Sequence, residues 1–262
     1  MTEPPVHALT QSEFRITRIF SRAWTLASTN LWTFFIVTAI SELPVRAYFR
    51  WGNAVGEFLV GTTMRAIVMF LGFVLVLLGQ AVLVHIGFRT LRGQAAGLRE
   101  ALQEASARFS PILGLSLIMC LLIFGMLGMI VLWALDLGPG LVAIVFMVVA
   151  GIPFVRWSLA LPACVVEGLG LVDSLGRSAE LTRGHRWKIF GIVILVLIPL
   201  PAATAILGAA MSFLGPDLRY LGRYVLGVLW ITGFTSVLTV IYHELRVANE
   251  GIDSGQIASV FD

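Results

Sequence analysis

Charged residues make up only 13% of this chain, so its arginines and glutamates are the first candidates for residues that could bind a ligand or do chemistry. Four of them are candidates for a site: Arg156 lies inside an apolar run toward its end, Glu167 and Arg246 follow the ends of such runs, and Arg177 lies in the polar connection between two runs. A guanidinium group binds carboxylate or phosphate oxygens, so these residues predict either a pocket for an anionic headgroup or a set of structural ion pairs. For Arg156 the structural alternative is a side chain that extends to lipid phosphates or pairs with Glu167 or Glu244.

The sequence contains no motif typical of catalysis, metal binding or nucleotide binding. The four histidines show no HExxH or other close ligand spacing, and Cys120 and Cys164 are isolated in apolar runs. No Walker-type loop, GxSxG elbow or dinucleotide fingerprint occurs. We therefore expect no catalytic residue, no metal and no cofactor, and a protein that is not an enzyme.

Hydrophobic residues account for 58% of the 262 residues, and the mean hydropathy is +0.92. A soluble domain is roughly 45–50% apolar, so the composition predicts an integral membrane protein. A spanning helix needs about 20 mainly apolar residues, and this chain has six runs that reach or approach that length. The predicted spans are Leu31 to about Tyr48, Ile67 to Phe88, Ile112 to Leu135, Leu141 to about Val166, about Trp187 to Leu214, and Tyr224 to Tyr242.

Charged residues and prolines interrupt two of these spans. Glu42, Pro44 and Arg46 fall in the first span. Because Glu42 and Arg46 are one helical turn apart, we expect them to pair near the outer interface. Pro199 and Pro201 should kink the fifth span, since proline removes a backbone donor and clashes with the preceding turn.

Three amphipathic segments precede the spans and are predicted to be helices lying in the plane of the cytoplasmic membrane surface. They run from Phe14 to Ala27, from Ala95 to Phe109, and from about Leu171 to Arg183. One all-α membrane domain of three related units is therefore expected, with unit boundaries at 14–92, 93–166 and 167–246 and terminal tails at 1–13 and 247–262. The alternative is that basic loops in an apolar bundle produce this pattern by coincidence. One uninterrupted helix from Phe14 to Ile40 would contradict the repeat.

The distribution of basic residues predicts how the chain is oriented. Most arginines and lysines fall in the loops on one side of the six spans. Basic loops tend to stay in the cytoplasm, so both termini are predicted to be cytoplasmic. The first residues, Met1 to Glu13, lack a basic start followed by an apolar run, so no cleavable signal peptide is expected.

Anionic membrane lipids are the expected partners of the basic residues along this rim. The residues expected to face lipid are Arg15, Arg18, Arg22, Arg183, Arg186 and Lys188. Because the positive charge is spread along a rim and not gathered in a groove, no nucleic acid partner is expected.

A series of motifs in the second half of the chain resembles a known bacterial family. The motifs are Pro162 and Glu167 in a Pro-x(4)-Glu step, Arg177-Ser178, Leu181-Thr182-x-Gly184, Trp187, Phe190, Tyr242, Leu245-Arg246 and Glu250-Gly251. They resemble the membrane domain of glycerophosphoryl diester phosphodiesterase and related six-span proteins of unassigned function. The resemblance implies a bacterial inner membrane and a role in lipids or the cell envelope. It does not imply phosphodiesterase activity, because in such families the catalytic residues belong to a soluble barrel, for which we expect no room here.

Three functions are compatible with these observations. The leading one is a non-enzymatic scaffold or accessory protein of the lipid or envelope area, which binds anionic headgroups and associates with a second copy or another membrane protein. A transporter or channel for a small or lipid-like solute is the first alternative, suggested by the repeats and the proline-kinked fifth span. The second is an intramembrane enzyme acting on lipid headgroups, with Arg156 and Glu167 as its core.

Overall fold

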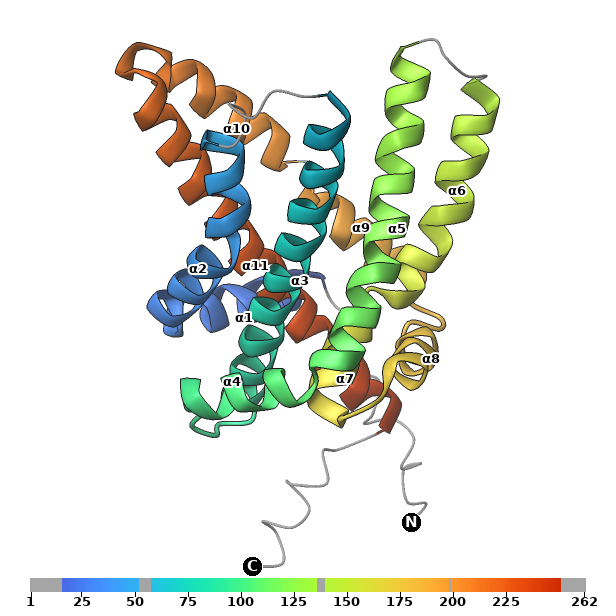
Figure 1. Cartoon of the computed structure of the whole chain (residues 1–262). Coiled ribbons are helices and arrows are strands. Elements are labelled where there is room, and N and C mark those ends of the chain that lie inside the picture. The colour runs from blue at the N-terminus through green and yellow to red at the C-terminus, as the bar shows by residue number, and fades with distance from the viewer. Residues whose placement is uncertain (1–15, 52–57, 136–139, 198, 251–262) are drawn as a thin grey trace, which may run out of the picture.

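The computed structural model describes residues 16–51, 58–135, 140–197 and 199–250, and within these ranges the chain is almost entirely helical and has no strand. This confirms the all-α prediction. The elements are α1 (Ile16–Thr29), α2 (Leu31–Trp51), α3 (Phe58–Leu91), α4 (Leu98–Ala107), α5 (Phe109–Ala134), α6 (Gly140–Trp157), α7 (Ala160–Glu167), α8 (Leu171–Leu181), α9 (Arg186–Leu197), α10 (Pro199–Ala210), the 3₁₀ helix η3 (Met211–Leu214) and α11 (Pro216–Glu250) (Figure 1).

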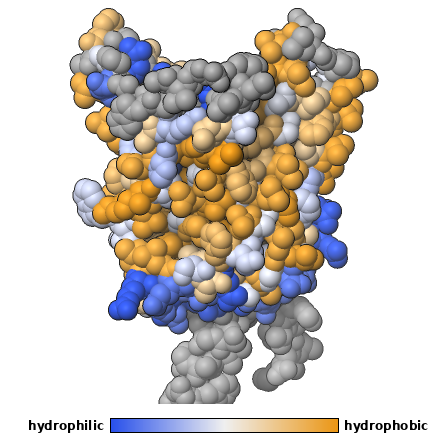
Figure 2. Space-filling view, viewed as in Figure 1, coloured by the Kyte–Doolittle hydropathy of each residue, from blue (hydrophilic) through white to orange (hydrophobic). Residues whose placement is uncertain are grey.

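Among the described residues, four helical segments are long and apolar enough to cross a membrane: Thr63–Leu91, Phe109–Trp133, Val148–Glu167 and Asp217–Glu250. The number becomes five if α1 and α2, up to Tyr48, are counted as one bent span. On the face shown in Figure 2, apolar side chains form a broad band, and hydrophilic residues gather below it. The chain is therefore a multi-pass membrane protein.

The predicted fifth span corresponds to two described helices on either side of residue 198, which lies outside the described residues. Helix α9 ends at Leu197 and α10 begins at Pro199, and each has only 12 residues. A proline is well tolerated at the first position of a helix, where no intrahelical donor is needed, but not in its interior. The kink expected at Pro199 and Pro201 therefore stays a prediction, and among the described residues four to five segments have the length and hydropathy that a membrane span needs.

The three amphipathic segments are found as the separate helices α1, α4 and α8. An 84° bend follows α1, so the chain is not one helix from α1 into α2. The apolar side of α1 is buried at Ile19, Ala23 and Leu26, whereas Arg18 and Arg22 are exposed. Helices α4 and α8 lie at the same end of the bundle, where α11 also ends, and we call this the α8 end (Figure 1).

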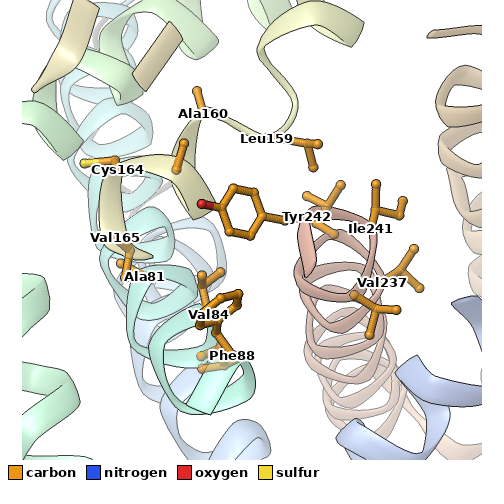
Figure 3. Close-up of a cluster of buried hydrophobic side chains, with 14 of the residues drawn as sticks. Ala81, Val84, Phe88, Leu159, Ala160, Cys164, Val165, Val237, Ile241 and Tyr242 are labelled. Atoms are coloured by element: carbon orange, nitrogen blue, oxygen red, sulfur yellow. The ribbon is translucent and has the colours of Figure 1, made fainter. Parts of the chain in front are cut away.

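The core nearest the α8 end is formed by α3, α7 and α11 (Figure 3). Small residues such as Ala81 and Ala163 are fully buried there, which lets the helices approach closely, as in other membrane bundles. Tyr242 of α11 is also fully buried, with its ring centroid 5.8 Å from that of Phe88. Its hydroxyl group points toward α7, and this places a polar group beside Glu167 at the end of that helix (Figure 3).

Candidate functional site

Glu167 is the centre of the charged residues at the α8 end. It is the last residue of α7, and Gly168 ends the helix in the left-handed conformation with φ of 72°. Arg177 of α8 donates from Nε to both carboxylate oxygens of Glu167, at 3.0 and 2.9 Å. The Tyr242 hydroxyl donates to the same carboxylate from α11. One carboxylate thus holds three helices together.

Arg177 also contacts two further carboxylates. Its Nη1 lies 3.3 Å from Glu180, and its Nη2 pairs with Glu250 of α11. Burial by itself would lower the pKa of Arg177, but the hydrogen bonds and charges of Glu167 and Glu180 outweigh it and raise the pKa above its ordinary value. The guanidinium group therefore stays charged, and its donors are directed to protein carboxylates.

Arg246 joins this arrangement through Glu250, since its Nε lies 2.8 Å from the Glu250 carboxylate. We call Glu167, Arg177, Glu180, Arg246 and Glu250 the ion-pair network. Two guanidinium groups face three carboxylates in it, so its net charge does not favour an added phosphate. This geometry corresponds to the structural ion pairs that the sequence left open as the alternative to a headgroup pocket.

The Arg156 side chain is not part of the ion-pair network. It is exposed and contacts no carboxylate in the described part of the chain. The backbone carbonyl of Arg156 accepts a hydrogen bond of 2.7 Å from Ser178, whose Oγ in turn accepts one of 3.1 Å from the Leu159 amide. The backbone at the end of α6 is therefore fixed to α8. The structure brings Glu167, Arg177 and Arg246 together but leaves the Arg156 side chain outside the ion-pair network, and the headgroup pocket stays a prediction.

Two residues expected to face lipid are on α1, and a third, Arg15, lies outside the described residues. Arg18 is exposed. Arg22 instead pairs with Glu244 of α11, although its side chain is still 48% exposed. Sequence reasoning missed this pair, because 222 positions separate the two residues and no local spacing connects them.

The remaining basic residues expected to face lipid surround Trp187 at the start of α9. We call Arg183, Arg186, Trp187 and Lys188 the rim cluster. Arg183 and Lys188 are exposed, and Trp187 is 86% exposed. The Nε of Arg186 is buried and has no hydrogen-bond partner among the described residues. Within the same residues no carboxylate pairs with any of the three cations, so this cluster differs from the ion-pair network.

A further contact that the sequence did not reveal joins the α4–α5 junction to the α7–α8 junction. Arg108 donates from Nη1 to the carbonyl of Gly168 at 2.5 Å and from Nε to Glu104 at 3.1 Å. A Cβ at Gly168 would lie 2.5 Å from Nη2 of Arg108. The left-handed backbone conformation favours glycine at position 168, and a Cβ there would also displace the Arg108 guanidinium group.

The predicted pair of Glu42 and Arg46 is confirmed in α2. The Arg46 Nη2 and the nearest Glu42 oxygen are 3.0 Å apart, and the Glu42 side chain is only 7% exposed. Helix α2, which carries this pair, leads away from α1 and from the α8 end (Figure 1).

Comparison with known proteins gives one match. The family model for the membrane domain of glycerophosphoryl diester phosphodiesterase matches residues 129–245, a range that includes Glu167, Arg177, Tyr242 and the rim cluster. No curated protein and no solved structure matches the chain. Over residues 129–245 the match confirms the resemblance to this membrane-domain family that the sequence motifs indicate.

Proposed function

We propose that this chain is a non-enzymatic protein of a bacterial inner membrane that binds anionic lipid headgroups at its cytoplasmic rim, as a scaffold or accessory protein for lipid or envelope functions. The observation that carries this proposal is the rim cluster. Its three cations have no protein carboxylate as a partner among the described residues, and they flank a tryptophan that is 86% exposed. Exposed tryptophan beside basic residues is typical of the membrane interface, where the indole ring and the cations contact headgroups.

The buried Nε of Arg186 supports the same conclusion. A buried donor without a partner costs about 1–3 kcal/mol, so such a group is normally satisfied by a ligand, water or lipid. A headgroup phosphate is an acceptor of suitable geometry for a guanidinium group. By contrast, Arg22 and Arg177 are directed to carboxylates and are less available to lipid.

The rim proposal includes a topology. Helices α1, α4 and α8 are taken as in-plane helices, and six crossings are completed when α2 crosses the membrane and α9 and α10 together form one further crossing. The α8 end then faces the cytoplasm, because basic loops favour that side. Partners that fit this arrangement are anionic lipids, with a second copy or another membrane protein beside the exposed apolar band.

The rim proposal is tested by measuring lipid retention with native mass spectrometry after gentle extraction of the full chain. The double variant Arg183→Gln/Lys188→Gln removes two exposed cations of the rim cluster. We expect it to lose most of its retained anionic lipid, because each basic residue near a charged surface contributes about 1 kcal/mol. Arg22→Gln/Arg89→Gln is the matched control, since it removes the same charge from arginines that pair with Glu244 and Glu100.

The proposal requires that the rim variant retain less anionic lipid than the control variant. Retention that falls equally in both would assign lipid binding to net charge alone. Unchanged retention in the rim variant would contradict a headgroup site at the rim cluster and direct the search to protein partners.

A further inference from the structure

A cavity of about 410 Å³ lies among α2, α3, α5 and α11. Its lining residues are Glu42, Val45, Arg46, Met69, Gly72, Phe73, Val76, Phe124 and Tyr220. The volume falls within the range of about 300–1,000 Å³ that is typical of small-molecule sites. One end of the cavity is charged and the rest of its wall is almost wholly apolar.

The charged end is the pair of Glu42 and Arg46. Arg46 donates from Nε at 3.1 Å and contacts from Nη2 at 3.0 Å, in both cases to the Oε2 atom of Glu42. This leaves Nη1 of Arg46 and Oε1 of Glu42 outside the hydrogen bonds of the described residues. The pair is neutral as a whole, but it presents one unused donor and one unused acceptor side by side.

Neighbouring residues hold this pair in place from α11. The Tyr220 hydroxyl donates to the Arg46 carbonyl, and the Tyr224 hydroxyl donates at 2.5 Å to the Ala39 carbonyl. A Cβ at Gly227 would collide with Nη2 of Arg46, so glycine at this position makes room for the guanidinium group. The polar end of the cavity is thus built by two helices and is not a chance contact of flexible side chains.

The apolar wall suits a hydrocarbon chain. Met69, Phe73 and Val76 come from α3, and Phe124 comes from α5. Phe124 is 42% exposed on the outer surface of its helix, so the apolar side of the cavity is continuous with the surface that faces lipid in a membrane. A ligand with a polar group at Arg46 and a chain toward Phe124 would match both ends.

We propose that this cavity binds one phospholipid that carries a phosphate and a primary ammonium group. The phosphate accepts from Nη1 of Arg46, the ammonium donates to Oε1 of Glu42, and part of an acyl chain lies along Met69, Phe73 and Phe124. A zwitterionic headgroup fits because a neutral pair at membrane depth cannot take an unpaired charge without a large desolvation cost. This site does not rest on the rim cluster, none of whose residues line the cavity.

The cavity proposal is tested by titrating the purified full chain in detergent with defined lipids and measuring bound lipid by native mass spectrometry. We expect phosphatidylethanolamine to bind at least about tenfold more tightly than phosphatidylcholine or phosphatidylglycerol, because only the first has both a phosphate and ammonium N–H donors. Soluble phosphoethanolamine, which lacks acyl chains, should bind far more weakly. Equal binding of the three phospholipids, or of phosphoethanolamine, would overturn the proposal.

Two variants locate the binding in this cavity. Val76→Phe fills it without touching the ion pair and should weaken phosphatidylethanolamine binding about tenfold, whereas Leu71→Phe, at a 54% exposed position of the same helix, should not. Glu42→Gln/Arg46→Gln removes both charges together and should abolish the preference for phosphatidylethanolamine. Wild-type affinity in Val76→Phe would overturn the site.

The double variant Arg183→Gln/Lys188→Gln should keep this binding, so failure at the rim and failure at the cavity are distinguishable.

Discussion

At the scale of single residues, Arg177 and Arg156 have opposite environments although the sequence groups them. Arg177 is 19% exposed and contacts three carboxylates, whereas the Arg156 side chain is exposed. The carboxylates around an arginine, and not its position relative to a span, therefore decide whether the arginine has a structural role.

Replacement of these two arginines should affect stability very differently. Arg177→Ala leaves Glu167 partly buried without its cation, and breaking such a pair costs on the order of 3 kcal/mol. We expect the melting temperature of the purified protein to fall by roughly 5–10 °C. Arg156→Ala is the control and should melt like the wild type. Equal melting temperatures for all three proteins would show that the ion-pair network does not stabilise the fold.

Residue pairs could be predicted from the sequence only where the spacing is local. Glu42 and Arg46 are four positions apart on one helix, so helical geometry alone predicts their contact. Arg22 and Glu244 meet because α1 packs on α11, and Arg108 reaches Gly168 because two interhelical junctions are adjacent. Such contacts depend on tertiary packing, for which hydropathy and helical periodicity contain no information.

At the scale of elements, the amphipathic helices were predictable, and four to five segments among the described residues are long and apolar enough to be spans. The helical spacing of Ile19, Ala23 and Leu26 is enough by itself to identify the buried side of α1. In the fifth apolar run the described residues end at Leu197 and resume at Pro199, so the kink predicted there stays a prediction. Average hydropathy measures whether a segment prefers lipid, but it does not detect a change of helix direction such as the 84° bend between α1 and α2.

The turn between α7 and α8 gives a prediction at this scale. Gly168→Ala should destabilise the protein by about 1–2 kcal/mol, because alanine in the left-handed conformation is unfavourable and its Cβ would collide with Arg108. Gly176→Ala is the matched control, since no atom outside its own helix lies within 4 Å of the new Cβ. Alanine inside α8 should be neutral or slightly stabilising. The measurement is thermal unfolding in one detergent, and equal destabilisation by both changes would contradict the role of the turn.

At the scale of the whole molecule, the proposed topology makes the two ends of the bundle distinguishable by chemical labelling. Gln94, between α3 and α4, is exposed, and Phe213 in η3 is 92% exposed. Both natural cysteines are buried and should react slowly. With an impermeant maleimide, Gln94→Cys should be labelled only in inverted membrane vesicles and Phe213→Cys only in right-side-out vesicles. Labelling of both from the same side would exclude the six-span topology.

Helix α11 also has a consequence for how the protein is assembled during synthesis. It contacts α1, α2, α3, α7, α8 and α10, and it supplies Tyr242, Arg246 and Glu250 at the α8 end. All of those helices precede it in the chain, so the ribosome completes them before their common partner exists. Until α11 emerges, Glu167 lacks its tyrosine and Arg177 lacks one of its carboxylates. The newly made helices must therefore be held in the membrane by lipid or by the insertion machinery until the last one arrives.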